Sequence, residues 1–483
     1  TEIYTLSLHD ALPISDVEEK VCAYLDLCRE NGVTALRLML RNMDIVGRVD
    51  PVQLQATLHL FDLGRERGLR FSVALHEDYD KPPYVNRDIV EKICLPHYTA
   101  GELAALPPHR ARFLVRKDIL ETPAARYLDA DAIRCQKEYL DELIPVLAGH
   151  EAVFRYEFEN EMVNPPMTWC REIAAHIRTI DPRTPILGNP GPHYWPEPWR
   201  WRDSTIDQFS YHPYNNGMER ADHGAVVFAR SKWAAAAGFP FGTGEGGINQ
   251  NRWQAEVPKV PNDFSMRGIR DQIWLSLACG ANGSFMWTAD CGAEMAEYGK
   301  VRPALEALGI DLAGLKRRPP RVVVAMPDNA KANNNACELA GNLLARGIDF
   351  DVRPDTAAEG YAVRLDGANP KVPDGLEAEL FAPAEGWQLA ALVAADGSQA
   401  LVYLRNVAGG IRNYGGEARP CWLRPPGQAP ASVRIRAGEW SQIRAFSLDR
   451  GEIVPVERNA DGILLPAGLF DDMVIGFVRR KDF

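Results

Sequence analysis

Short apolar runs alternate with amphipathic stretches from residue 16 to about residue 315. The runs are continuous, as is typical of strands buried on both faces, whereas the stretches between them repeat their apolar residues with the period of a helix. Because parallel strands need a crossover, usually a helix, this alternation predicts a parallel sheet covered by helices. The seven runs lie at about 33–39, 70–75, 153–158, 185–189, 206–211, 239–244 and 283–287.

The number of runs indicates which parallel fold to expect. A (β/α)8 TIM barrel has eight strand-helix pairs and typically about 250 residues. Residues 16–318 supply seven strands, and their first complete element is a helix, so we expect an α/β TIM barrel that lacks its native strand 1. A doubly wound open sheet is the alternative, but no Gly-rich phosphate-binding motif such as GxGxxG follows any of the runs.

The first fifteen residues, TEIYTLSLHDALPIS, show neither a helical nor a strand period. Their segment IYTLSLHDALPI resembles the translation of a common short-read sequencing adapter. We therefore expect residues 1–15 to be an adapter-derived artefact joined to a truncated gene, and we exclude them from the fold. Localisation stays open on this interpretation, because the native N-terminus would be missing.

The pattern changes after Lys316, at the charged and Pro-rich sequence KRRPPR. Residues 319–360 predict one strand-helix-strand unit, which is too small to bury its own core and should therefore pack against the rest of the chain. Residues 361–483 contain period-two runs such as QALVYLRN and DMVIGFVRR, separated by Gly and Pro turns. These runs predict a C-terminal antiparallel β-sandwich.

Composition excludes several classes of partner. The net charge is −11 and no extended Lys/Arg-rich run is present, which argues against nucleic acid or an anionic membrane surface. No apolar stretch approaches the roughly 18 residues of a membrane-spanning helix. The nine cysteines are scattered without a CxxC pair, so we expect no metal site and no cofactor. The oligomeric state stays open.

Polar residues lie at the carboxyl ends of the predicted strands, which is where (β/α) barrels carry their reactive groups. The sequence VFRYEFENEM places Glu157, Glu159 and Glu161 within five residues at one such end. Burying carboxylates together is costly unless each has a partner or a proton. The strand-end residues singled out are Arg37, His76, Asn160, Glu161, His212, Tyr214, Glu245 and Trp287.

Six segments around these residues carry a resemblance to a known group of enzymes. YEFENEM resembles the strand-4 pattern aromatic-Glu-x-x-Asn-Glu of that group, and GTGEGG resembles its strand-7 motif. GVTALRLML, SVALHED, FSYHPY and GSFMWTAD resemble its segments at strands 2, 3, 6 and 8. The group is the clan A glycoside hydrolases, and the most similar member is a cellulase-like glycoside hydrolase of family 5. Gly246 is a departure, since many relatives have an aromatic residue there.

The resemblance implies an O-glycosyl hydrolase with two catalytic carboxylates. Glu161 would be the acid/base and Glu245 the nucleophile of a retaining reaction on a β-linked oligo- or polysaccharide, with the carboxyl groups about 5–5.5 Å apart. It also implies that Asn160 contacts the sugar 2-hydroxyl and that Arg37 supports the nucleophile. The residues assigned to substrate binding are Arg37, His76, Asn160, His212, Tyr214 and Trp287.

The physical roles agree with this assignment. Arg37, Tyr214 and His212 would hold Glu245 ionised, because a cation and hydrogen bonds stabilise the charged form. Glu161 would keep its proton longer near that negative charge, as an acid must. Trp287 would offer an apolar face to the sugar ring.

Alternatives stay open for single residues and for the function. Arg37 could form an ion pair inside the barrel, His76 could be a satisfied core histidine, and Trp287 could serve packing alone. We expect Glu157 to pair with a basic group inside the barrel and Glu159 to be more peripheral. The alternative functions are a non-catalytic carbohydrate-binding barrel and a glycosidase inactivated by truncation.

Overall fold

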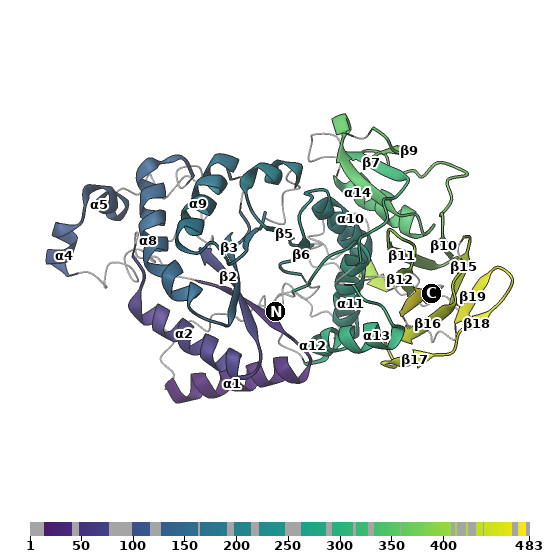
Figure 1. The fold of residues 1–483 in the computed structure, drawn as a ribbon, viewed down its shortest axis with the longest axis horizontal. Coiled ribbons are helices and arrows are strands. Elements are labelled where there is room, and N and C mark those ends of the chain that lie inside the picture. Colours follow the sequence, from purple (N-terminus) through teal and green to yellow (C-terminus); the bar gives the residue numbers. More distant parts are fainter. Residues whose placement is uncertain are drawn as a thin grey trace. The chain divides into compact units, whose positions relative to one another are not determined.

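The computed structural model forms two compact units, Thr1–Ser210 and Tyr211–Phe483 (Figure 1). No described helix is both long enough and apolar enough to span a membrane. The residues that the structure describes are 14–40, 48–76, 99–115, 127–162, 165–190, 198–213, 222–246, 262–285, 292–312, 315–326, 333–357, 359–406, 411–412, 422–423, 431–437, 439–465 and 472–479.

The first unit contains a parallel sheet in the order β1-β2-β3-β4-β5, in which neighbours in space are also neighbours along the chain. Helices follow the strands, as the alternation in the sequence predicts, and cover the sheet (Figure 1). The strands are β1 (Ala35–Met39), β2 (Arg70–His76), β3 (Val153–Glu159), β4 (Ile186–Gly188) and β5 (Gln208–Tyr211). The helices are α1 (Ile14–Glu30), α2 (Pro51–Glu66), α4 (Ala100–Ala105), α5 (Pro108–Val115), α8 (Ala130–Ala148), α9 (Met167–Ile180) and the 3-10 helix η3 (Pro198–Ser204).

Local sequence explains where two of these helices begin. The carboxylate of Asp50 accepts hydrogen bonds from the backbone N–H groups of Val52 and Gln53, and Pro51 occupies the first helical position of α2. Asp129 caps α8 in the same way. Such caps satisfy N–H groups that have no partner within the helix, and each contributes about 1 kcal/mol.

The second unit begins with the last residue of β5. The carbonyl of Tyr211 accepts from Gly244 N at 2.9 Å, directly after β6 (Phe241–Thr243). On the other side of β6, the backbone N–H of Phe285 donates to the carbonyl of Thr243 at 3.1 Å, and a parallel bridge joins Thr243 to Ser284. The helices here are α10 (His223–Ala235), α11 (Asn262–Ala278), α12 (Gly292–Gly299) and α13 (Val301–Leu308).

The α/β organisation predicted for residues 16–318 is therefore confirmed in its described parts. The predicted strand 283–287 is described only as far as residue 285. The adapter segment lies outside the described residues except for its last two, since α1 begins at Ile14. The absence of a native strand 1 consequently stays a prediction.

A small three-stranded parallel sheet follows, in the order β8-β7-β9. It has one strand more than predicted, because Val363–Asp366 pairs with β7 beyond the expected boundary at residue 360. Phe350 of β8 packs edge-on against Phe228 of α10, with ring centroids 5.5 Å apart, so the predicted packing against the rest of the chain is confirmed. The elements are β7 (Val322–Met326), α14 (Asn333–Leu344), β8 (Phe350–Pro354) and β9 (Val363–Asp366).

Most of the described residues after β9 belong to two antiparallel sheets, in the orders β10-β15-β19-β18 and β11-β12-β20-β16-β17. Both contribute to one hydrophobic core, in which Phe381 of the first sheet lies 4.5 Å from Phe477 of the second, centroid to centroid. The period-two strands are thus present as predicted, and their description as a β-sandwich stays an interpretation. The strands are β10 (Phe381–Pro383), β11 (Trp387–Val393), β12 (Gln399–Asn406), β15 (Ala431–Ile435), β16 (Gln442–Ser447), β17 (Glu452–Val454), β18 (Glu457–Arg458), β19 (Gly462–Leu465) and β20 (Met473–Val478). A separate pair joins β13 (Ile411–Arg412) to β14 (Trp422–Leu423).

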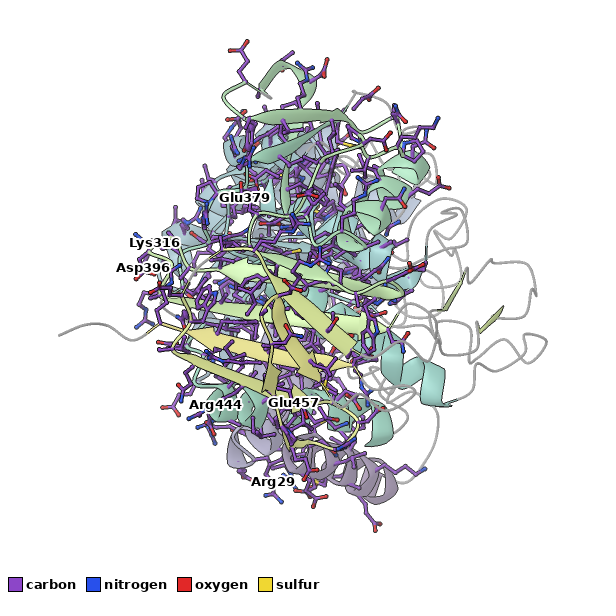
Figure 2. All side chains as sticks on the ribbon, turned by 90° about the vertical axis from the view of Figure 1, so that its right-hand side faces the viewer. Arg29, Lys316, Glu379, Asp396, Arg444 and Glu457 are labelled. Carbon is purple, nitrogen blue, oxygen red and sulfur yellow. The ribbon has the colours of Figure 1, made fainter. Side chains whose placement is uncertain are left out.

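The charged and Pro-rich sequence KRRPPR begins along the edge of β11. The backbone N–H of Arg318 donates to the carbonyl of Val393 at 2.8 Å, and Ala395 N donates to the carbonyl of Lys316 at 2.7 Å. Figure 2 accordingly shows Lys316 and Asp396 beside one another. Arg444, labelled in the same view, donates to the carbonyl of Ala307 at the end of α13, at 2.9 Å. The segment is therefore part of the packed structure and does not act as a free linker.

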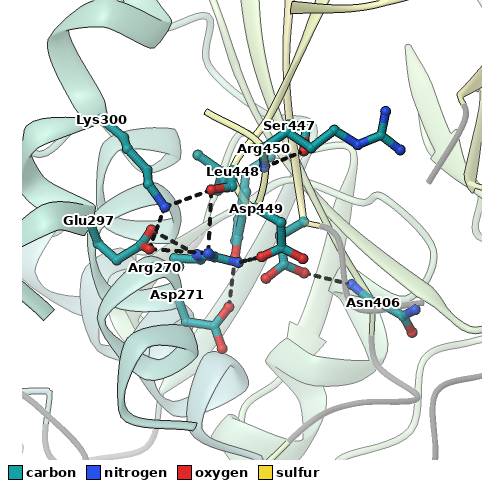
Figure 3. Close-up of polar contacts among 11 residues, drawn as sticks. Arg270, Asp271, Glu297, Lys300, Asn406, Ser447, Leu448, Asp449 and Arg450 are labelled. Carbon is teal, nitrogen blue, oxygen red and sulfur yellow. Dashed lines mark hydrogen bonds and ion pairs between the residues drawn. The ribbon is translucent and has the colours of Figure 1, made fainter. Parts of the chain in front are cut away.

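A buried ionic network binds helix α11 to the C-terminal tail, residues 319–483 (Figure 3). Arg270 donates to both oxygens of Glu297, at 2.7 and 3.1 Å, and also to Asp449. Lys300 donates to Glu297 at 2.6 Å and to the carbonyl of Leu448 at 2.7 Å. Because Glu297 is only 2% exposed, the two cations offset the cost of burying its carboxylate.

The next residue of α11 enters a second buried cluster. The hydroxyl of Tyr403 donates to Asp271 at 3.0 Å, and Arg405 pairs with Asp271 at 2.9 Å and with Asp222, the N-cap of α10, at 2.7 Å. Burial raises the pKa of Asp271 to about 7, although Arg405 acts in the opposite direction. Strand β12 thus connects the start of α10 to the middle of α11.

Candidate active site

Three glutamates lie at the end of β3, and the first of them is a buried ion-pair partner. The carboxylate of Glu157 accepts hydrogen bonds from Nε of Arg37 at 2.8 Å and from Nη2 at 2.6 Å, and both side chains are fully buried. Asn189, at the end of β4, donates to the same carboxylate at 2.6 Å. The expectation that Glu157 pairs with a basic group is therefore confirmed.

Arg37 also fixes the orientation of Asn160. Its Nη2 donates to Oδ1 of that residue at 2.8 Å, and Asn160 is only 4% exposed. With the carbonyl oxygen of the amide occupied in this way, Nδ2 is left to donate to other acceptors. The ion pair inside the barrel that was considered as the alternative for Arg37 thus exists, with Glu157 as the partner. The same guanidinium orients the amide of Asn160.

A second arginine lies beside this pair. Arg155 donates from Nε to Oγ of Ser72 at 2.7 Å. Burial, together with the nearby charge of Arg37, lowers the pKa of Arg155 to about 10, while Glu157 opposes the shift. Glu157 is therefore the anion that offsets two buried cations.

Glu159 is also buried, so the expectation of a peripheral position is wrong. Its side chain accepts from the hydroxyl of Tyr127 at 2.9 Å, and the residue is 1% exposed. Tyr127 lies just before α8 and packs edge-on against Trp169, with centroids 4.9 Å apart. It belongs to the long connection after β2, whose course the sequence pattern does not reveal.

Glu161 differs from both in its backbone. Its φ is 50°, and the only other described residue besides glycine with positive φ is Thr205, at 61°. The flanking residues are tied to the neighbouring strands, since Asn160 N donates to the carbonyl of His76 at 3.3 Å and Met162 N to that of Asn189 at 3.0 Å. Glu161 is half-buried. The chain is thus anchored on both sides of a residue in an unfavourable conformation.

His76 is half-buried at the end of β2. Its ring lies 4.9 Å from that of Tyr139, whose hydroxyl donates to the carbonyl of Leu75 at 2.9 Å. This packing against α8 agrees with the structural role considered for His76, and its assignment to substrate binding stays a prediction.

In the second unit, His212 and Glu245 come together. His212 directly follows β5 and Glu245 lies two residues after β6, and the distance from Nδ1 to Oε2 is 3.3 Å. Both side chains are almost completely buried. Arg230 of α10 donates to the carbonyl of His212 at 2.9 Å, which fixes the backbone beside the imidazole.

The remaining predicted site residues, Tyr214 and Trp287, lie outside the described residues. In the described part of either unit taken alone, no three His, Cys, Asp or Glu side chains converge as metal ligands. Asn189 was missed by the sequence analysis, although it ends a predicted strand and the strand-end rule applied there would have found it.

No protein-family model matches the chain, and none of the curated proteins matches it. Solved structures do. An alanine variant of GH5_18 from Streptomyces cattleya, in complex with Manβ1-4GlcNAc, is 16% identical, covers 73% of this chain and 94% of its own, and has a TM-score of 0.50. An alanine variant of GH5_18 from Bifidobacterium longum subsp. longum, in complex with the same disaccharide, is 13% identical, covers 75% and 93%, and has a TM-score of 0.51. A GH5_18 from Bifidobacterium longum subsp. infantis is 14% identical, covers 72% and 91%, and has a TM-score of 0.51.

The fold is that of the family 5 glycoside hydrolases. The resemblance to family 5 noted in the sequence is thus supported by structure, and the chain contains an α/β TIM-barrel-like domain. The matched share of the chain is larger than residues 16–318 alone, so the likeness extends beyond the predicted barrel.

Proposed function

We propose that the chain is a retaining glycoside hydrolase that cleaves a β-glycosidic bond through a covalent glycosyl-enzyme. The observation that carries the proposal is the left-handed backbone of Glu161 at the end of a parallel strand, anchored to the strands on both sides. Such strain costs about 1–3 kcal/mol and concentrates at functional sites. The fold shared with family 5 glycoside hydrolases supports the same conclusion.

In the first step, a carboxylate oxygen of Glu245 attacks the anomeric carbon while Glu161 donates its proton to the departing glycosidic oxygen. The bond from sugar to leaving group breaks as the bond to Glu245 forms. Imidazole Nδ1 of His212, at 3.3 Å from Oε2, orients the nucleophile. Nδ2 of Asn160, whose Oδ1 is held by Arg37, donates to the sugar 2-hydroxyl.

In the second step, Glu161 takes a proton from water, and the resulting hydroxide oxygen attacks the anomeric carbon and releases Glu245. Two inversions give net retention. Arg37 acts mainly by orienting Asn160, and His76, Tyr214 and Trp287 complete the proposed substrate site. We interpret residues 361–483 as a β-sandwich that supports the barrel and carries no catalytic group.

For the substrate class, we propose a β-linked oligosaccharide and place β-mannosides first. Two of the similar structures contain Manβ1-4GlcNAc. At 13–16% identity they share the fold, so the first test is a panel of aryl β-glycosides that includes the mannoside, the glucoside and the galactoside.

Azide rescue tests the assignment of the two glutamates. Glu161→Ala should still form the glycosyl-enzyme from an activated aryl glycoside and then stall, because no base activates water. Added azide needs no base and should release a β-glycosyl azide. Glu245→Ala should hydrolyse no β-glycoside, with or without azide.

An α-glycosyl azide from the Glu161 variant would reverse the two roles. In a crystal structure, the carboxyl groups of Glu161 and Glu245 should lie about 5–5.5 Å apart, whereas about 6.5–9.5 Å would indicate inversion. Binding of an oligosaccharide without any cleavage would favour the non-catalytic alternative, and a protein that does neither would favour inactivation by truncation.

A further inference from the structure

Gln272 of α11 reaches from the helix to the end of β6 and is fully buried. Its Nε2 lies 2.6 Å from the carbonyl of Phe285, 3.1 Å from Oγ of Ser284 and 3.3 Å from Oγ1 of Thr243. Thr243 in turn donates to Ser284 at 2.7 Å and accepts from Phe285 N at 3.1 Å. One carboxamide therefore joins two neighbouring strand ends, and Glu245 follows Thr243 by two residues.

The other end of the same carboxamide lies against Gly246. A Cβ atom built on Gly246 would lie 1.9 Å from Oε1 of Gln272, 2.4 Å from Cδ and 2.8 Å from Nε2. Real Cβ contacts are never so short, so no side chain fits at position 246 while Gln272 keeps its place. Oε1 makes no hydrogen bond to the described residues. Gln272 thus lies against the chain two residues before Glu245, at Thr243, and one residue after it, at Gly246.

The rest of α11 holds Gln272 in position. Of the two preceding residues, Arg270 donates to Glu297 and Asp449 (Figure 3). The other, Asp271, accepts from the hydroxyl of Tyr403. A helix anchored at successive residues has little freedom to rotate or slide. The position of the Gln272 amide is consequently set by the packing of the helix and does not depend on a flexible loop.

From this geometry we infer that Gln272 is a positioning residue for residues 243–246, the loop that carries Glu245. Its amide fills the space that a side chain at Gly246 would need. The inference rests on the proposed function of Glu245. The amide fixes Thr243 on one side of Glu245 and occupies the space of a side chain at Gly246 on the other. It acts through the backbone of the loop and does not touch the reacting atoms. A side chain at position 246 would therefore displace the Gln272 amide from this place.

A double-mutant cycle tests the match. Gly246→Ala alone should lower kcat by about 10- to 100-fold on the best aryl β-glycoside, since a displacement near 1 Å is worth up to 100-fold. Gln272→Ala should lower kcat by about tenfold and leave KM nearly unchanged, because the loop loses its support while the sugar contacts persist. The double variant should be no worse than Gln272→Ala, as the new methyl group enters the vacated space.

Gln388→Ala is the matched control, because Gln388 is also a buried glutamine that donates to a backbone carbonyl, that of Gly341 at 3.1 Å. It should lower the melting temperature without changing kcat. The melting temperatures of the cycle give a second measurement: Gly246→Ala should destabilise the wild type and be nearly neutral in the Gln272→Ala background. A variant that fails to fold alone but folds in the double would give the same support.

The outcomes separate the two proposals. Wild-type protein that cleaves no glycoside of the panel would refute the proposed function. If the wild-type protein is active and Gln272→Ala leaves kcat unchanged, only the positioning role of Gln272 is refuted. Additive effects of the two substitutions on kcat and on melting temperature would refute the steric match.

Discussion

The backbone of Glu161 makes a prediction about stability that is independent of the substrate. Replacing Glu161 by Gly or by Ala removes the same carboxylate, and the two variants differ in how well they tolerate a φ of 50°. At ordinary φ, Ala is the more stabilising of the two by about 0.4–1 kcal/mol, since Gly has more freedom to lose on folding. At a left-handed position the order should reverse.

The size of the reversal follows from two opposing contributions. Left-handed backbone costs an L-residue about 1–2 kcal/mol, and the entropy advantage of Ala recovers about 0.4–1 kcal/mol of this. We therefore expect Glu161→Gly to be more stable than Glu161→Ala by about 0.5–1 kcal/mol. Both variants should be equally inactive in unassisted hydrolysis, because both lack the acid.

Thermal unfolding of the two variants, measured side by side, is the assay, with an expected difference of about 1–3 °C. Thr205 provides the control, because it is exposed, has a φ of 61° and belongs to the same unit. Thr205→Gly should exceed Thr205→Ala in melting temperature by a similar amount, with turnover unchanged. A higher melting temperature for Glu161→Ala than for Glu161→Gly would show that no strain is stored at the proposed acid.

Three further outcomes follow from the buried charges. Burial raises the pKa of Asp271 in the folded state from 3.8 to about 7, so between these pH values the folded state keeps a proton that the unfolded state loses. The melting temperature should therefore fall as the pH rises from 3.8 to about 7, and Asp271→Asn should reduce that fall. Glu157→Gln should destabilise the protein by about 3–5 kcal/mol in denaturant unfolding, since it leaves Arg37 buried without its anion, and a loss below about 1 kcal/mol would contradict the pairing. Ending the chain after Arg318 should give insoluble or unfolded protein by circular dichroism, because α11 would lose its partners in the tail; a folded, monomeric barrel would contradict this.

The order of elements could be predicted from sequence because each depends on local periodicity. Strand β3 lies within a residue of its predicted bounds, and helices α8 and α9 lie between predicted strands. These segments have strong apolar patterns, and α8 has an Asp129 cap in addition. The third strand of the small sheet was not foreseen, because Val363–Asp366 has only one buried position and pairs by a non-local contact.

The site shows the same limit. Strand-end residues such as Glu161 and Glu245 could be predicted, because parallel strands point their carboxyl ends to one edge. The burial of Glu159 could not be, since it depends on Tyr127 from a long irregular connection. Gln272 lies in the middle of a helix, where nothing in its neighbours along the chain distinguishes it from a solvent-facing glutamine.

The match between Gly246 and Gln272 restricts the order in which this chain can change during evolution. A Cβ atom at position 246 would lie 1.9 Å from Oε1 of Gln272, so a larger residue at 246 is accommodated most easily after position 272 has accepted a smaller side chain. If position 246 changed first, its new side chain would clash with Gln272 in the intermediate. Homologues should accordingly show a bulky residue at one of these positions or at the other, and the ancestral history of the pair should be legible as a sequence of paired substitutions.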